Sequence, residues 1–339
     1  MREETIPPTS GQPPLRISVV MCTFNGARYL HQQMDSILRQ TYPVEEVIVQ
    51  DDGSSDETFS LLEHYAKRDE RVRLYRNESG LHGVNGNFFS AMARAKGDYI
   101  AISDQDDIWE HDKLRLQAEA IGKSLLCSGF SVPFSEDGYP VRVDMRCPTT
   151  HLLRNTYLCA LPGHSLLFHR SLLDVIKGGE RLPLYYDTQL VMSAAAAESV
   201  VFVEEVLVHF RRHSAAATAT LPVGGGLISR GAWDYVWVSL FYHRFLQGEV
   251  RKRFAIIKPM LERMPFSTRS LRDGIYMSSL QMRRDPVAFL KRIVFFMRHS
   301  RHILFTEERN ALLRLLRAAF FVYSCGYYYR AHLAQHKHK

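Results

Sequence analysis

The first hundred residues alternate between short strand-like runs and longer segments with helical periodicity. The strand-like runs are Ile17–Cys22, Val47–Val49, Val72–Tyr75 and Ile100–Ile102. Between them, apolar residues recur three and four positions apart, which is typical of amphipathic helices. Parallel strands need connections of this length. The alternation therefore predicts an α/β fold with a mostly parallel, Rossmann-like nucleotide-binding sheet and helices on both faces.

Several residues mark where these helices should begin and end. Ser55 is a predicted N-cap of the second helix and Asn87 of the third, because such side chains accept hydrogen bonds from the first helical turn. Gly97 is predicted to end the third helix. Near the other end of the chain, Asp285 followed by Pro286 predicts a further helix start.

Acidic residues directly follow two of the predicted strands. Asp51 and Asp52 end the second strand, and Asp104, Asp106 and Asp107 follow the fourth. Carboxylates this close repel one another, and a divalent cation that bridges to phosphate would relieve the repulsion. Ligands of open α/β sheets bind beyond the carboxyl ends of the strands. The two acidic clusters therefore predict one nucleotide site that uses Mg²⁺ or Mn²⁺.

Charge is distributed unevenly along the 339 residues, whose net charge is +7. Residues 230–339 contain 21 Lys and Arg against 7 Asp and Glu, leaving 22 and 29 in the first 229 residues. A basic segment of this kind favours an anionic partner such as the cytoplasmic face of a membrane. The alternative is a helical bundle packed on the rest of the protein with solvated arginines outside. We see no nucleic-acid recognition motif and expect no nucleic-acid partner.

The cysteines and the apolar runs favour a cytoplasmic protein. The five cysteines form no C-x-x-C pair, and their odd number argues against a disulfide framework. The N-terminal segment is polar and proline-rich, without the apolar core of a signal peptide. The longest apolar run near the end, Ala318–Tyr329, is shorter than the ~20 residues that span a bilayer.

The same signals divide the chain into three parts. We expect a disordered lead-in over residues 1–14 and a catalytic domain over 15–229, with a nucleotide half (15–115) and an acceptor half (116–229). Residues 230–339 should form a basic α-helical domain, because their pattern is helical nearly to the end.

Four segments resemble sequence blocks of the GT-A glycosyltransferases of family 2. The resemblance is strong over residues 16–115, weaker over 150–215 and absent beyond about 230. The matching segments are Ile17–Gly26 (the family's VSVVIPTYN block), Val47–Thr58 (vDDGSxDxT), Gly97–Asp106 (GdyiaflDxD), and Gly83–Phe88 with Ser103–Trp109, which are similar to the bacterial rhamnosyltransferase-like subgroup. Their order and spacing together are specific.

This resemblance implies an inverting, metal-dependent transferase of the GT-A fold and assigns roles to individual residues. Asp52 would accept a hydrogen bond from a pyrimidine N–H, and Phe24 would stack on the base. Asp104 and Asp106 would bind the metal, with Asp107 orienting Asp106 or acting through water. The other predicted donor contacts are Thr23, Asn25, Asp51, Asn87, Gln105, Gly163 and Arg212, with Asp104 also counted among them.

Two further roles come from the second half of the resemblance. Asp187 matches the family's acidic residue at a helix start and is the predicted catalytic base, with Gln189 where Trp is usual. The competing interpretation of Asp187 is an ordinary N-cap. His213 lies in a segment similar to the subgroup's YRxH and is a predicted metal ligand, although a lone histidine is more often structural.

The resemblance also favours particular substrates. The predicted donor is dTDP-L-rhamnose, with a UDP-hexose or UDP-N-acetylhexosamine as the alternative. The acceptor would be an oligosaccharide or lipid-linked glycan of bacterial surface polysaccharide synthesis (lipopolysaccharide, O-antigen or capsule), handled by an enzyme peripheral on the inner membrane. Two other classes stay open: a sugar nucleotidyltransferase, whose basic loop after the first strand is here reduced to Arg28, and a non-catalytic nucleotide-sugar-binding assembly subunit.

Overall fold

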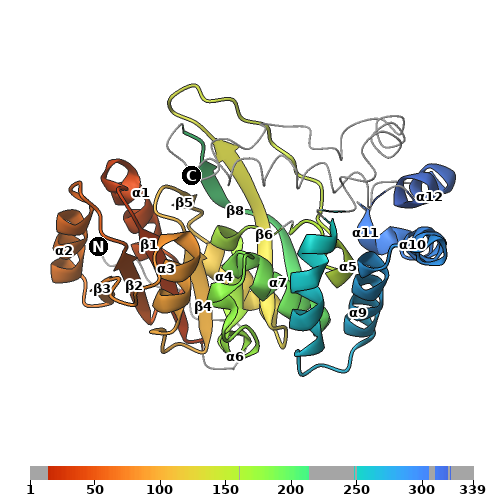
Figure 1. Cartoon of the computed structure of the whole chain (residues 1–339). Coiled ribbons are helices and arrows are strands. Elements are labelled where there is room, and N and C mark those ends of the chain that lie inside the picture. Colours follow the sequence, from red (N-terminus) through yellow and green to blue (C-terminus); the bar gives the residue numbers. More distant parts are fainter. Residues whose placement is uncertain are drawn as a thin grey trace. The chain divides into compact units, whose positions relative to one another are not determined.

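The computed structural model describes residues 14–159, 161–213, 248, 250–304, 310–319 and 321 (Figure 1). These residues fall into two compact units. The first unit contains the described residues up to Phe134, Leu161–Ala194 and Ser199–Arg211. The second contains those of Ser135–Ala160, Ala195–Glu198 and everything described from Arg212 onward.

The first unit is built on an eight-stranded mixed sheet of order β3-β2-β1-β4-β7-β6-β8-β5 (Figure 1). The strands are β1 (Ile17–Thr23), β2 (Glu46–Asp51), β3 (Val72–Arg76), β4 (Tyr99–Ser103), β5 (Ile108–Trp109), β6 (Leu126–Phe134), β7 (Leu167–His169) and β8 (Val200–Arg211). Strands β3, β2, β1 and β4 are mutually parallel, as predicted. Strand β7 runs antiparallel to β4 and β6, and β5 runs antiparallel to β8. The α/β fold class is confirmed, with a mixed second half of the sheet.

Helices follow the first strands at the expected places. Fully buried Val19 and Met21 of β1 belong to one apolar core with Leu30 and Met34 of the first helix. This burial explains why the three- and four-residue spacing of the sequence gave the correct helix face. The helices are α1 (Ala27–Leu38), α2 (Thr58–Arg68), α3 (Gly83–Met92), α4 (Lys113–Ile121), α6 (Leu172–Val175) and α7 (Tyr186–Ala196), with 3₁₀ turns η1 (Gly163–Ser165) and η2 (Gly179–Arg181).

The two predicted N-caps in this unit are wrong. Helix α2 begins at Thr58 with Glu57 before it, and the Ser55 hydroxyl instead contacts Asn25 Oδ1 at 3.3 Å. Helix α3 begins at Gly83, so Asn87 lies inside it, where Asn87 Oδ1 accepts a hydrogen bond from Gln50 Nε2 at 2.9 Å. Both side chains are recruited by partners distant in sequence, which a local cap pattern does not contain.

The end predicted for α3 is also wrong. The helix ends at Met92, five residues before Gly97. Gly97 is required for another reason, because a Cβ there would lie 2.6 Å from the carbonyl oxygen of Arg16. The glycine therefore allows the chain entering β4 to pass close beside the start of β1.

The regular secondary structure described in the second unit is helical, and residues 135–151 form a loop. Its helices are α5 (Leu152–Asn155), residues 250–262, α9 (Arg269–Met282), α10 (Pro286–Arg298), α11 (Ser300–Ile303) and α12 (Ala311–Ala319). Buried Tyr157 is surrounded by the rings of Phe254, Phe296 and Phe321 at centroid distances of 4.9–5.8 Å. The predicted helix start at Asp285 and Pro286 is confirmed: α10 begins at Pro286, and Asp285 Oδ1 accepts a hydrogen bond from Ala288 N at 2.9 Å.

Some expectations fall on residues outside the described part of the chain. They concern the lead-in over residues 1–13 and most of the apolar run from Ala318 to Tyr329. The domain boundaries and the packing of the basic C-terminal segment stay predictions. None of the described helices is both long enough and apolar enough to cross a bilayer.

Candidate donor and metal site

Asp51, at the carboxyl end of β2, organises the loop that follows it. Its carboxylate is fully buried and accepts hydrogen bonds from Thr23 Oγ1 (2.9 Å), Gly53 N (3.1 Å), Ser54 N (2.9 Å) and Ser54 Oγ (2.5 Å). The predicted donor contacts Thr23 and Asp51 are thus bonded to each other. Their part in donor binding stays a prediction, and the contacts seen here shape the loop.

Asn25 joins the β1–α1 loop to the β2–α2 loop. Its backbone has φ of 49°, a left-handed conformation that asparagine tolerates better than most residues. Asn25 Oδ1 accepts a hydrogen bond from Ser55 N at 2.8 Å, and Asn25 N donates to Ser54 Oγ at 2.8 Å. The two loops at the ends of β1 and β2 therefore form one bonded platform.

Phe24 lies on this platform with its side chain open to solvent. The residue is 55% exposed, although a free phenyl ring would normally be buried. Its backbone is clamped by Gln105, whose Oε1 accepts from Phe24 N at 2.9 Å and whose Nε2 donates to Phe24 O at 3.1 Å. A Cβ on Gly26 would lie 2.2 Å from Gln105 Oε1, so this clamp requires glycine there. An exposed ring carried by a fixed backbone is suited to stacking on a base.

Asp52 is held by donors from the segment after β3. Its Oδ1 accepts from Asn77 Nδ2 at 2.7 Å and lies 2.7 Å from His82 Nδ1, while its Oδ2 accepts from Gly83 N at 2.7 Å. A carboxylate has about four lone-pair positions. Among the residues that the structure describes, Gly83 N is the one hydrogen-bond donor to Oδ2, which leaves a position there for the predicted pyrimidine N–H.

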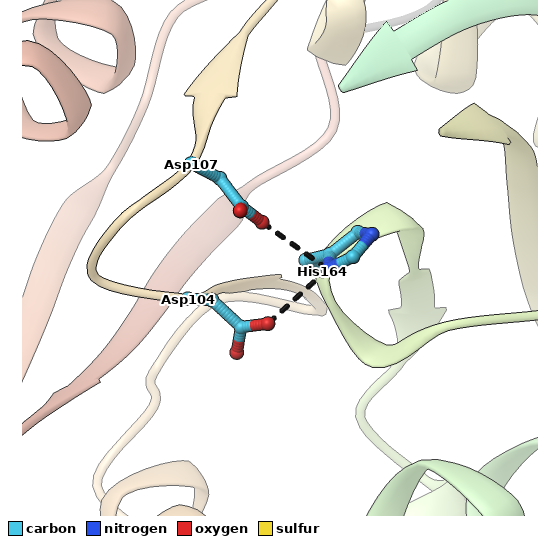
Figure 2. A group of neighbouring side chains, drawn as sticks. All are labelled: Asp104, Asp107 and His164. Atoms are coloured by element: carbon cyan, nitrogen blue, oxygen red, sulfur yellow. Dashed lines mark hydrogen bonds and ion pairs between the residues drawn. The ribbon is translucent and has the colours of Figure 1, made fainter. Parts of the chain in front are cut away.

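Asp104, Asp107 and His164 form a group that could hold a metal ion (Figure 2). His164 Nδ1 lies 3.1 Å from Asp104 Oδ2 and 3.1 Å from Asp107 Oδ2. Figure 2 shows both carboxylates, from the segment between β4 and β5, pointing at the His164 ring of η1. The ring is fixed on its other side, because Nε2 lies 2.6 Å from Ser131 Oγ of β6. Such a second bond is what orients a metal-binding histidine.

The surroundings of the Asp107 carboxylate fit a bound cation. Its Oδ1 accepts from Arg211 N at 3.1 Å, but its buried Oδ2 has no hydrogen-bond partner among the described residues. The 3.1 Å approach of His164 Nδ1 to this oxygen is an ion-pair contact without hydrogen-bond geometry. Burial, followed by the neighbouring carboxylates Asp104 and Asp106, raises the pKa of Asp107, while His164 opposes the rise. The two carboxylate oxygens suit Mg²⁺ or Mn²⁺.

His164 itself is drawn toward the charged form by these acids. Burial alone would lower its pKa, but the carboxylates of Asp107 and Asp104 outweigh this effect and raise the pKa to about 9. The two carboxylates thus favour the imidazolium form of His164. Metal binding at this group would release that proton, because the ligand form of histidine is neutral.

The predicted metal ligands Asp106 and His213 are not in this group. The backbone carbonyl of Asp106 accepts from Arg211 Nε at 2.9 Å. His213 and the predicted donor contact Arg212 are buried residues of the second unit, and the Arg212 guanidinium lies 5.4 Å from the Tyr139 ring centroid. Asn87, another predicted donor contact, is buried against Gln50. The ligand and donor roles of all four residues stay predictions.

Asp187 lies in the first turn of α7, beside η1. Burial raises the pKa of its carboxyl group, and Asp104 raises it further, while hydrogen bonds from Thr188 and from the backbone of Gly163 oppose the rise. Glycine at position 163 leaves room for the neighbouring Tyr186, because a Cβ there would lie 2.3 Å from the Tyr186 hydroxyl oxygen. A carboxylate with a raised pKa is suited to accept a proton.

The Cys22 thiol is influenced by both acidic clusters. Burial raises its pKa first, and the negative charges of Asp104 and Asp52 raise it further. Both carboxylates therefore lie near this one thiol at the end of β1. The two acidic strand ends meet at one edge of the sheet, as their order in the sequence predicts.

Sequence reasoning gave Gln189, His164 and Asp107 too little weight. Gln189 stands where the family usually has Trp, and its buried amide donates to the carbonyls of Gly179 and Leu184, both at 2.9 Å. His164 belongs to the segment Gly163–Ser165, which resembles a family loop beside the donor sugar, but only Gly163 was given a role in it. Asp107 was expected only to assist Asp106.

The chain is similar to known glycosyl transferases in sequence and in fold. Residues 18–176 match the family model described as Glycosyl transferase family 2. The family predicted from the sequence is thus the one whose model matches this part of the chain, a little less than half of the 339 residues.

Two curated relatives and one solved structure illustrate the match. TuaG of Bacillus subtilis, named as a glycosyltransferase of teichuronic acid biosynthesis, is 33% identical over 153 residues, which are 43% of this chain. WfgD of Escherichia coli, a UDP-Glc:α-D-GlcNAc-diphosphoundecaprenol β-1,3-glucosyltransferase, is 37% identical over 109 residues, which are 32% of this chain. Residues 1–349 of S. aureus TarS, solved with UDP-GlcNAc, match with a TM-score of 0.54 at 16% identity, covering 93% of this chain and 92% of that one.

These matches bear on the fold more fully than on the activity. The TarS likeness confirms the predicted GT-A fold. The aligned regions span 60% of TuaG and 42% of WfgD, less than two thirds of either relative.

Proposed function

We propose that this chain is an inverting glycosyltransferase that moves a sugar from a nucleoside-diphosphate donor to an acceptor hydroxyl, with Mg²⁺ or Mn²⁺. The observation that carries the proposal is the arrangement at η1. His164 of this turn faces Asp104 and Asp107, while the backbone of the adjacent Gly163 contacts Asp187. A candidate cation site and a candidate base thus lie on either side of one short turn.

The residues divide the reaction between them. The exposed ring of Phe24 stacks on the base, and the free position on Asp52 Oδ2 accepts its N–H. Asp104, Asp107 and His164 would hold the cation, with Asp106 and His213 as further candidate ligands. When bound, the cation would supply Lewis acidity that stabilises the departing nucleoside diphosphate.

Asp187 supplies the proton transfer. The acceptor hydroxyl oxygen forms a bond to the anomeric carbon as the bond from that carbon to the diphosphate oxygen breaks. The hydroxyl proton passes to the Asp187 carboxylate. Because attack comes from the face opposite the leaving group, the configuration of the anomeric carbon inverts. The raised pKa of Asp187 makes the carboxylate a better proton acceptor than an ordinary aspartate.

The donor we propose has a pyrimidine base. The sequence resemblance to the rhamnosyltransferase-like subgroup favours dTDP-L-rhamnose. A UDP-hexose or UDP-N-acetylhexosamine is supported by the name of WfgD, which specifies UDP-Glc, and by the TarS complex with UDP-GlcNAc. The buried Gln189 amide in place of Trp belongs to the neighbourhood of the proposed base and is a candidate source of acceptor specificity.

The acceptor we propose is a glycan of bacterial surface polysaccharide synthesis. The names of TuaG and WfgD refer to teichuronic acid and to a diphosphoundecaprenol-linked sugar, respectively. An acceptor on such a lipid would place this enzyme at the cytoplasmic face of the membrane, peripherally bound.

Nucleotide release from a panel of sugar nucleotides tests the proposal directly. The purified chain should hydrolyse one pyrimidine donor slowly without acceptor, and only when Mg²⁺ or Mn²⁺ is present. Asp187→Asn should slow transfer while Asp174→Asn, an exposed acid of α6, should not. Donor binding without metal-dependent release from any donor would instead support the non-catalytic subunit.

A further inference from the structure

Helix α10 presents one solvent-exposed face that combines apolar and cationic side chains. Val287, Leu290 and Val294 are 56%, 61% and 56% exposed, and they lie three and four positions apart. Exposed Lys291 lies four positions after Val287, and exposed Arg298 lies four positions after Val294. Side chains at these intervals lie along one face of a helix. We call these five residues the α10 face.

Polar residues would be expected on a helix face turned to water. The opposite side of α10 is already used, because Ala288, Phe295 and Phe296 are buried within the second unit. Three exposed branched aliphatic side chains on a 13-residue helix are therefore surplus to the packing of this unit. Helix α12, which packs against α10, also exposes Leu312 and Leu316.

The positive charge around this face favours an anionic partner. Residues 265–304 contain eight Lys and Arg against two Asp, and α10 itself contains no acidic residue. Asp285, at the start of α10, is engaged by Arg283 at 2.8 Å. On α9, exposed Arg272 and the 48% exposed Tyr276 add a cation and an amphipathic ring. An apolar stripe flanked by cations matches the boundary between lipid headgroups and acyl chains.

We propose that the α10 face docks on a bilayer surface containing anionic phospholipids. Val287, Leu290 and Val294 would enter the acyl boundary while Lys291 and Arg298 remain among the phosphates. A second copy of this chain is a poor occupant, because it would bring the same positive charges into contact. This inference deepens the proposed membrane location of the enzyme but does not depend on catalysis.

Vesicle sedimentation of the full chain tests the docking. We expect binding to phosphatidylcholine vesicles that contain one third phosphatidylglycerol, little binding to pure phosphatidylcholine, and weaker binding as salt rises. Leu290→Glu and Lys291→Glu should each weaken binding to the anionic vesicles by about tenfold or more. Val143→Glu changes a 52% exposed apolar residue in a loop of the same unit and should bind like the unaltered chain.

Three results would overturn the proposal. They are no binding of the unaltered chain to anionic vesicles, equal binding by Leu290→Glu, or an equal loss in Val143→Glu. Circular dichroism of each variant separates lost docking from lost folding. Vesicle-free nucleotide release, measured on the same samples, should be unchanged in the α10 variants. A chain that binds vesicles but never releases nucleotide would retain the docking surface and refute the proposed activity.

Discussion

Phe24 and Gln105 hold each other by two reciprocal hydrogen bonds between a backbone amide and a side-chain amide, of 2.9 and 3.1 Å. These residues come from different strand ends, and the pair fixes the backbone beneath an exposed phenyl ring. Backbone that is fixed before the donor arrives loses less conformational entropy on binding.

Gln105→Ala should therefore weaken donor binding with little effect on stability. Loss of the clamp frees the Phe24 ring, and base–aromatic stacking is worth about 1–3 kcal/mol, so we expect the donor KM to rise by about tenfold. Initial rates against donor concentration, with melting temperature as a control, measure this. An unchanged KM would mean that Phe24 does not meet the base.

Asp107→Asn and His164→Ala should weaken metal binding. Asparagine keeps the acceptor for Arg211 N but removes the charge, and the alanine removes the nitrogen that faces both carboxylates. We expect Mn²⁺ affinity, measured by electron paramagnetic resonance titration, to fall by about tenfold or more in each variant.

Asp106→Asn is the matched comparison for that titration. The side chain of Asp106 lies outside the group formed by Asp104, Asp107 and His164, so its replacement should cost less Mn²⁺ affinity than the replacement of Asp107. The reverse order would support the pair Asp104 and Asp106 as the principal ligands.

The rate of transfer should fall as the pH is lowered through the pKa of Asp187. The base acts only when deprotonated, and burial together with Asp104 raises this pKa above that of an ordinary aspartate. The acid limb of kcat/KM should thus lie above the usual aspartate range. Asp187→Asn should lower kcat by about 100-fold or more and remove that limb. A limb that persists in the variant belongs to another group.

Because of Lys113, the free energy of unfolding of the first unit should rise as the pH rises. Its buried amine donates to Gln117 Oε1 at 2.9 Å and lies 4.0 Å from the Trp109 ring centroid, and burial lowers its pKa to about 7. The unfolded chain keeps this proton up to about pH 10. Between these values the unfolded state binds more protons, so the free energy of unfolding rises with pH.

Lys113→Met isolates this contribution. Urea unfolding of both proteins from about pH 6 to pH 9 should give curves that converge as the pH rises, because the variant lacks the penalty of burying a charge. Loss of the donor to Gln117 lowers the variant's stability by a similar amount at every pH. Parallel pH profiles would show that Lys113 titrates normally.

Much of the fold and part of the site followed from local sequence. The strands β1, β2 and β4 were predictable because each is a short apolar run buried along its length, and Asp51, Asp52 and Asp104 lie where those runs end. Parallel strands place such ends at one edge whatever the details of packing. The cap at Asp285 was equally local, since its partner Ala288 is three residues away.

Tertiary structure alone decided which groups meet. His164 lies 60 positions after Asp104, and its ring is oriented by a contact with Ser131 of strand β6. Asn87 and Ser55 have side chains that commonly cap helices, but here they form hydrogen bonds with Gln50 and Asn25 instead. A side-chain hydrogen bond depends on atoms brought together by packing, whereas strand and helix periodicity depends on neighbours along the chain. The sequence of this protein therefore determined where its acids lie in the fold, and only the folded chain determined that Asp104 and Asp107 would face His164.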